Sequence, residues 1–127
     1  MSEFVTLSQQ TATLRESFNQ FDSVLREIFV KLEDALSRLY EEDLSLNKKF
    51  DIVIEAEYIV VAARAKILVE LSNIQKVLSS STTSSGIEKL FKDRYSTIIS
   101  MCQRINELRE DFSVVQRSMW ARNNGRL

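Results

Sequence analysis

The feature that most constrains this chain is the absence of breaks. Its 127 residues include no proline and only two glycines, Gly86 and Gly125. Proline and glycine are the residues that most often punctuate strands and tight turns, so their scarcity favours long uninterrupted helices. Hydrophobic residues make up 44% and charged residues 28% of the chain, as in proteins that bury a core. We therefore expect a single all-α domain over residues 1–127.

Apolar residues recur every seven positions in the first and last segments, the spacing of a coiled-coil seam. The first segment carries two such rows: Leu7, Leu14, Phe21, Ile28 and Ala35, and Phe18, Leu25, Leu32, Leu39 and Leu46. The last segment carries two more, which only Arg94 interrupts: Phe91, Ile98, Ile105, Phe112 and Met119, and Met101, Leu108 and Val115. Together with the middle segment, these rows predict helices over about 6–42, 47–78 and 86–121.

Seven consecutive hydroxyl residues, SSSTTSS, separate the second and third predicted helices. Ser85 is followed three places later by Glu88, the spacing of a capping box, in which each side chain satisfies a free backbone N–H of the other residue. We expect the third helix to begin there. The loop over 79–85 then has the length of a connection between antiparallel helices, so it is predicted to be a hairpin connector and not a domain linker.

Residues 41–50, EEDLSLNKKF, leave two architectures open. A turn near residues 43–47 would give an elongated three-helix bundle. An unbroken helix would give a long rod and a helical hairpin with coiled-coil packing, and Leu46, Val53, Val60, Ile67 and Ile74 do continue the seven-residue phase. We favour the turn, because it lets one chain bury its own first seam.

The middle segment, DIVIEAEYIVVAARAKILVEL, is apolar on nearly every side of a helix. A helix of this kind is buried on more than one side. One side would face the chain's own helices, through Val53, Val60, Ile67, Leu71 and Ile74. The opposite side would bind a partner, and it comprises Ile54, Tyr58, Val61, Ala65 and Leu68.

The residue types that most enzymes and metal sites need are missing. The chain has no histidine and one cysteine, Cys102, which argues against zinc binding and Cys–His catalysis. Gly86 stands alone, so no phosphate-binding loop exists, and Asp51 with Glu55 is one carboxylate pair without further ligands. We expect no catalytic, cofactor or metal site. The net charge of −1 also disfavours nucleic acid as a partner.

The tail QRSMWARNNGRL offers a second candidate contact, centred on Trp120 and Arg122. Tryptophan and arginine often anchor protein interfaces, and the same mixture also suits an anionic membrane surface, which is the secondary interpretation. The interpretation that we favour for this tail is structural: Trp120 closes the end of the bundle beside Met119, and the arginines lie at the negative end of the helix dipole. A single cysteine and the lack of a long charge-free apolar run indicate a soluble cytoplasmic or nuclear protein.

These features predict a non-enzymatic adaptor or scaffold subunit of a larger helical complex, either a homo-oligomer or a hetero-oligomer. Its partners would be helical proteins that cover the second apolar side of the middle helix. The alternative is a small helical chaperone that holds a hydrophobic client segment transiently on the same surface.

Overall fold

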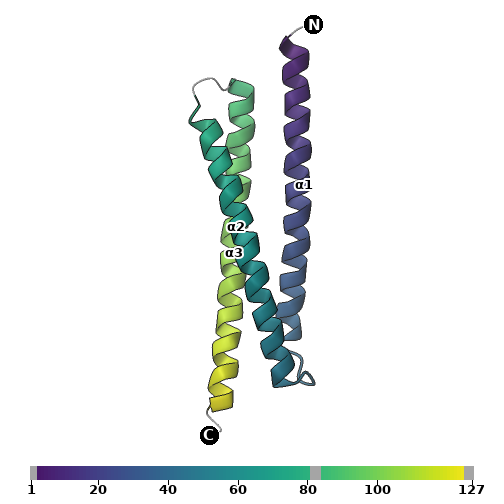
Figure 1. Cartoon of the computed structure of the whole chain (residues 1–127), viewed down its shortest axis with the longest axis vertical. Helices are drawn as coiled ribbons and strands as arrows, with labels where there is room; N and C mark the ends of the chain where they lie inside the picture. Colours follow the sequence, from purple (N-terminus) through teal and green to yellow (C-terminus); the bar gives the residue numbers. More distant parts are fainter. Residues whose placement is uncertain (1–2, 81–83, 125–127) are drawn as a thin grey trace.

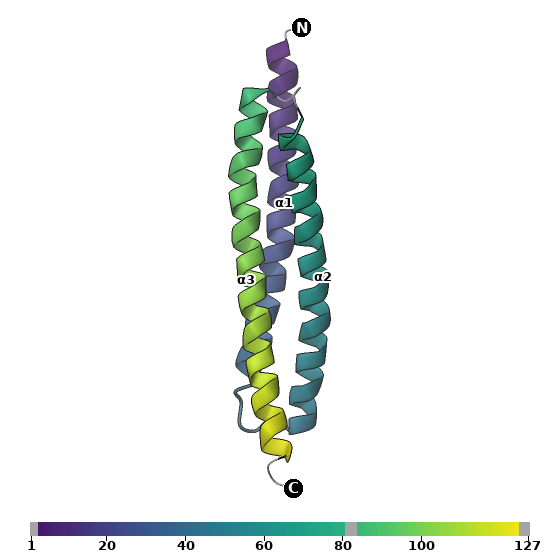
Figure 2. The ribbon, with the colours of Figure 1, turned by 90° about the vertical axis from the view of Figure 1, so that its left-hand side faces the viewer.

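A computed structural model describes residues 3–80 and 84–124, with side chains for 9–80 and 84–122. Its described residues form three helices and no strand: α1 (Glu3–Arg38), α2 (Leu46–Leu78) and α3 (Ser85–Asn124). The helices lie side by side along one long axis, with α2 antiparallel to both α1 and α3 (Figure 1). Figure 2 shows that α1 extends past the others at one end of the molecule and α3 at the opposite end. The prediction of an elongated all-α three-helix bundle is confirmed.

The rows of seven-residue spacing form the core. One row from each helix is buried: Phe18, Leu25, Leu32 and Leu39; Val53, Val60, Ile67 and Ile74; Phe91, Ile98, Ile105, Phe112 and Met119. The other row of α1 packs against this core while staying partly exposed, and its described members are Leu14, Phe21, Ile28 and Ala35. The side chain of Leu7, predicted to belong to that row, lies outside the described residues. Because these rows repeat at the same seven-residue phase, their side chains meet in one core between the three helices.

The rod interpretation of residues 41–50 is wrong. Helix α1 ends at Arg38, before the expected residue 42, and the Glu41 N–H donates to the Arg38 carbonyl at 3.1 Å in the turn that follows. Helix α2 begins after Ser45, whose side-chain oxygen accepts a hydrogen bond from the Lys48 N–H at 3.3 Å. Leu46, which continues the seven-residue phase, is 38% exposed and does not prolong the buried row. Folding back lets α2 cover the first seam, which a rod would leave in water.

The start of α3 differs from the predicted capping box by one residue. The Ser84 hydroxyl oxygen accepts the hydrogen bond from the Ile87 N–H at 3.4 Å, so Ser84 is the cap and Ser85 is the first helical residue. The Glu88 carboxylate forms an ion pair with Lys92 at 3.0 Å, and no hydrogen bond from it to the helix start is found among the described residues. Residues 81–83 of the predicted 79–85 loop lie outside the described residues.

A buried arginine joins α3 to α1. The Arg94 side chain is 4% exposed, and its Nη1 lies 2.6 Å from Asp22 Oδ1. Its guanidinium carbon lies 4.6 Å from the ring centroid of Phe18 and 5.4 Å from that of Phe21. Phe18 also meets Phe91 edge to face, with 5.6 Å between ring centroids. This cluster fixes where α1 sits along α3, because a buried charge is stable only against its partner.

Candidate interaction surface

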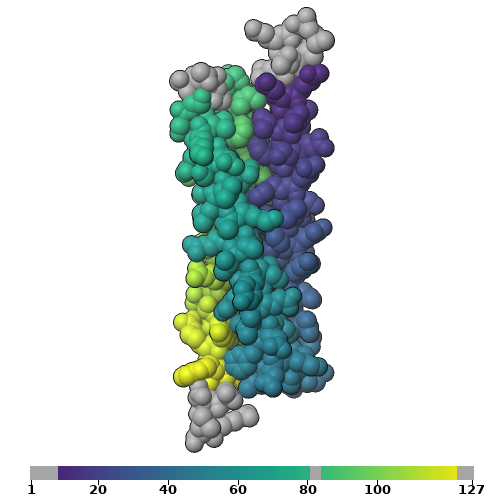
Figure 3. Space-filling model, in the orientation of Figure 1, coloured from purple at the N-terminus to yellow at the C-terminus, as the bar shows by residue number. Residues whose placement is uncertain are grey.

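The side of α2 opposite the core carries a continuous apolar stripe. We call it the α2 stripe, and it comprises Ile54, Tyr58, Val61, Ala65 and Leu68. Its four large side chains are exposed, by 51% at Ile54, 75% at Tyr58, 67% at Val61 and 47% at Leu68, and Ala65 is exposed as well. The residues are three or four positions apart, so they share one helical face. The space-filling view shows α2 lying across the front of the molecule (Figure 3).

The opposite face of the same helix is occupied by the bundle. Val53, Val60, Ile67 and Ile74 are each at most 3% exposed, and Leu71 packs against the core in a partly buried position. The predicted division of α2 into an inward face and an outward face therefore agrees with the structure. Both faces of this helix are apolar, and the described part of the chain covers only one of them.

A groove runs along the stripe between α2 and α3. One hollow of about 310 Å³ is lined by Glu57, Val60, Val61, Arg109, Phe112 and Ser113. A neighbouring hollow of about 240 Å³ is lined by Val60, Val61, Arg64, Ala65, Leu68 and Arg109. Val60, Val61 and Arg109 line both hollows. The stripe thus continues into a concave surface with a positively charged α3 side chain at its edge.

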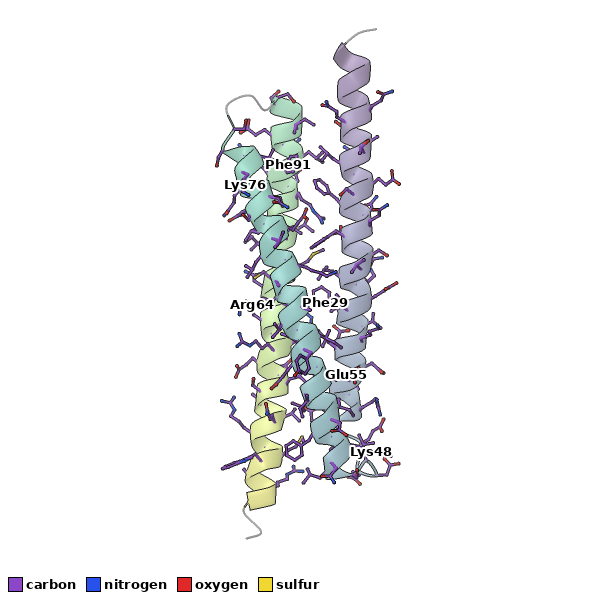
Figure 4. The ribbon with its side chains drawn as sticks, in the orientation of Figure 1. Phe29, Lys48, Glu55, Arg64, Lys76 and Phe91 are labelled. Atoms are coloured by element: carbon purple, nitrogen blue, oxygen red, sulfur yellow. The ribbon has the colours of Figure 1, made fainter. Side chains whose placement is uncertain are left out.

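Charged residues border the stripe on its two sides. Glu57 and Arg64 lie on the side of α3, where they line the hollows with Arg109. Glu55 lies on the side of α1, where it lines a shallow hollow with Lys31. Figure 4 labels Arg64 and Glu55 on these two sides of α2. A partner helix on the stripe would therefore meet a charged border, of mixed sign on the α3 side.

The structure separates the two predicted residues of the tail. Trp120 is 64% exposed and does not cover the end of the bundle, although its neighbour Met119 is buried. Trp120 lies seven residues after Ser113, so it projects from the same side of α3 as the groove. Arg122 is exposed too, but two residues further along a helix lie on nearly the opposite side. Trp120 and Arg122 therefore point to different sides of α3, and Trp120 is the one on the side of the groove.

Two surface residues were missed in the sequence. Val69, 61% exposed, widens the stripe on the side of Glu55. Arg109 borders both hollows from α3. The position of Val69 on the helix could have indicated its place. Nothing in the sequence could have placed Arg109, because its position depends on how α3 is aligned along α2.

The described residues carry little that suggests chemistry. They contain no group of three or more histidine, cysteine, aspartate or glutamate side chains that could hold a metal ion. Cys102 is half-buried, and its Sγ accepts a hydrogen bond from the Asn106 amide at 3.9 Å. No helix, within the part of the chain that is described, is long and apolar enough to cross a membrane.

Comparisons with known proteins find no match for this chain among family models, curated proteins or solved structures.

Proposed function

We propose that this protein is a non-enzymatic adaptor or scaffold subunit of a cytoplasmic or nuclear complex, and that it binds helical protein partners through the α2 stripe. The observation that supports this proposal is the second apolar face of α2, which stays in water while the first face forms the core. Contiguous exposed apolar surface of this kind is typical of protein interaction sites.

The composition of the stripe suits a helical partner. Ala65 lets a second helix approach closely in the middle of the stripe, and the larger side chains on either side of it can interdigitate with those of that helix. Tyr58 supplies an aromatic anchor, one of the residue types that contribute most to binding energy. Apolar anchors three, four and seven residues apart are also the pattern by which helices are recognised.

A photocrosslinking residue placed at position 58 tests this proposal in cells. We expect the crosslinker in place of Tyr58 to capture a protein through a helical segment. Val61→Asp in the same chain should abolish the capture, because a charge buried in an apolar interface costs about 3 kcal/mol or more, which is roughly a hundredfold in affinity.

Val30 provides the matched control. It is an apolar residue on α1, 60% exposed and outside the stripe. Val30→Asp should leave the capture at position 58 unchanged, and a crosslinker at position 30 should capture nothing specific. Equal losses from both aspartate variants, with helical circular dichroism retained, would contradict the proposed role of the stripe. A capture that dissociates rapidly in the purified state would instead favour the chaperone alternative.

A further inference from the structure

Two charged residues on one border of the α2 stripe lack an ion-pair partner among the residues that the structure describes. Glu57 and Arg64 make no ion pair in the part of the chain that the structure describes, and the buried Nε of Arg64 has no hydrogen-bond partner there. They are seven residues apart, about 10.5 Å along the helix axis, so they cannot pair with each other. Of the described arginines, Arg94, Arg104 and Arg117 form ion pairs with carboxylates, and Arg64 is among those that do not.

The spacing of four stripe residues allows them to pack against the same four residues of a second copy in the antiparallel direction. With a second copy of α2 laid antiparallel, Tyr58 can lie opposite Val61 of that copy, and Ile54 opposite its Ala65. Each pair matches a larger side chain with a smaller one, and a two-fold axis between Tyr58 and Val61 generates all four contacts. A parallel arrangement would instead place Ala65 against Ala65 and leave a gap between the two helices at that position.

The same antiparallel placement pairs the free charges. In an antiparallel pair of identical helices, each border of one helix lies beside the same border of the other. Glu57 therefore lies opposite Arg64 of the second copy, and Arg64 lies opposite Glu57 of the second copy. In the parallel arrangement Glu57 would face Ala62, and Arg64 would face Val69. Neither of those residues could neutralise a charge.

The charges also select one register. Sliding one helix by a heptad in one direction brings Arg64 opposite Arg64 of the second copy, and sliding it in the other direction brings Glu57 opposite Glu57. Like charges at these positions oppose association. Arg109 borders the hollows that Glu57 and Arg64 line, and it adds positive charge where Glu57 of the second copy would lie.

We infer that the occupant of the α2 stripe is a second copy of this chain, bound antiparallel about a two-fold axis with reciprocal contacts between Glu57 and Arg64. This inference rests on the proposed function, because it identifies the partner of the same surface. It makes the protein a homodimer whose two bundles are joined through their middle helices.

Charge reversal with complementation tests this arrangement on the full-length chain. Sedimentation velocity over a range of concentrations should show a dimer for the wild type. Glu57→Arg and Arg64→Glu should each weaken that dimer by roughly tenfold or more, because each brings like charges together at both ends of the interface. The two variants mixed in equal amounts should associate with each other, since every contact in the mixed dimer is again between opposite charges. The double variant should also recover self-association.

Lys66, on the other border of the stripe, gives the control, and Lys66→Glu should leave the dimer unchanged. If a reversal lowers the helical circular dichroism, Glu57→Gln and Arg64→Gln replace it, and each should weaken the dimer by several-fold. The inference would be overturned if the charge substitutions left the dimer affinity unchanged. It would also be overturned if the mixture of the two single variants failed to form a dimer. A wild type that stays monomeric would overturn it as well, whereas the capture at position 58 would still decide whether the stripe binds a different protein.

Discussion

The buried contact between Arg94 and Asp22 leads to a prediction that its two residues contribute unequally to stability. Removing one member of a buried ion pair typically costs about 3–5 kcal/mol, because the other charge is left without a partner. The Arg94 side chain is 4% exposed, and without Asp22 its nearest polar contact is the Phe18 carbonyl at 3.5 Å. Asp22→Ala should therefore be destabilising.

The size of the effect follows from the exposure of the two side chains. Asp22 is 28% exposed, so water can partly reach the guanidinium once the carboxylate is gone. Alanine also gains about 0.5 kcal/mol of helix propensity over aspartate. These two effects reduce the expected loss for Asp22→Ala to about 2–3 kcal/mol, or roughly 6–15 °C in melting temperature for a chain of this size.

Arg94→Met should behave differently. Methionine keeps most of the buried volume and removes the charge that costs solvation, while Asp22 can turn to water. Replacing a buried ion pair by apolar residues of similar size is often neutral or stabilising, and here the remaining partner, Asp22, is 28% exposed and can be hydrated, so we expect a change within about 1 kcal/mol. The geometry of the ion pair agrees with a small contribution to stability. Asp22 Oδ1 lies 2.6 Å from Arg94 Nη1, but Asp22 Oδ1 and Arg94 Nε both lack a hydrogen-bond partner within the described residues.

Denaturant unfolding followed by circular dichroism measures both variants, and the chain supplies a matched control. Arg104 and Glu33 also link α3 to α1, at 2.5 Å, but their side chains are 42% and 50% exposed. Glu33→Ala should cost no more than about 1 kcal/mol, as exposed ion pairs do. If Arg94→Met costs as much as Asp22→Ala, the ion pair is itself stabilising and the reasoning is wrong. If Asp22→Ala lowers the free energy of unfolding no more than Glu33→Ala does, burial does not determine how much these ion pairs contribute to stability.

Two further measurements check the core and the tail. Leu25 and Ile105 are both 0% exposed, so Leu25→Ala and Ile105→Ala should each lower the free energy of unfolding by about 2–5 kcal/mol in urea titrations; losses below about 1 kcal/mol would mean that these side chains are not packed as described. Trp120 is the only tryptophan and is 64% exposed, so its fluorescence in the native state should be that of an indole in water and should be quenched by acrylamide. A protected, blue-shifted emission from the monomer would contradict the outward position of Trp120.

The fold was predictable because the apolar residues that recur every seven positions in the sequence are the residues that pack in the core. Leu25, Ile67 and Ile105 belong to rows visible in the sequence, and all three are fully buried. The break between α1 and α2 was harder, since neither proline nor glycine marks it. Ser45 is a suitable cap, but Lys48 stands where the capping box would have glutamate. Only the need to bury the first seam favoured a turn there.

The cap of α3 shows the limit of a local motif. Ser84 and Ser85 are adjacent and chemically identical, and Ser85 has the spacing from Glu88 that a capping box requires. The structure uses Ser84, and Glu88 forms an ion pair with Lys92 instead of a capping contact. A choice between neighbouring serines depends on where other side chains go, which the motif does not contain.

The outward face of α2 could be predicted, but its surroundings could not. Periodicity placed Tyr58 and Val61 on one face, and their exposure depends only on where the core lies. Helix geometry alone could also have separated Trp120 from Arg122, since residues two apart point to nearly opposite sides. Arg109 is different, because it reaches the groove only through the alignment of α3 along α2.

The border charges combine both kinds of information. The sequence places Glu57 and Arg64 at the same heptad position, which by itself excludes an ion pair between them. Whether a side chain of α1 or α3 forms an ion pair with them depends on the tertiary structure. Within the described residues, no side chain of either helix does so. An exposed apolar stripe could bind many helices, but one bordered by a glutamate and an arginine seven residues apart is complementary to its own reversed copy. The charge pattern therefore restricts orientation and register more than the apolar residues do.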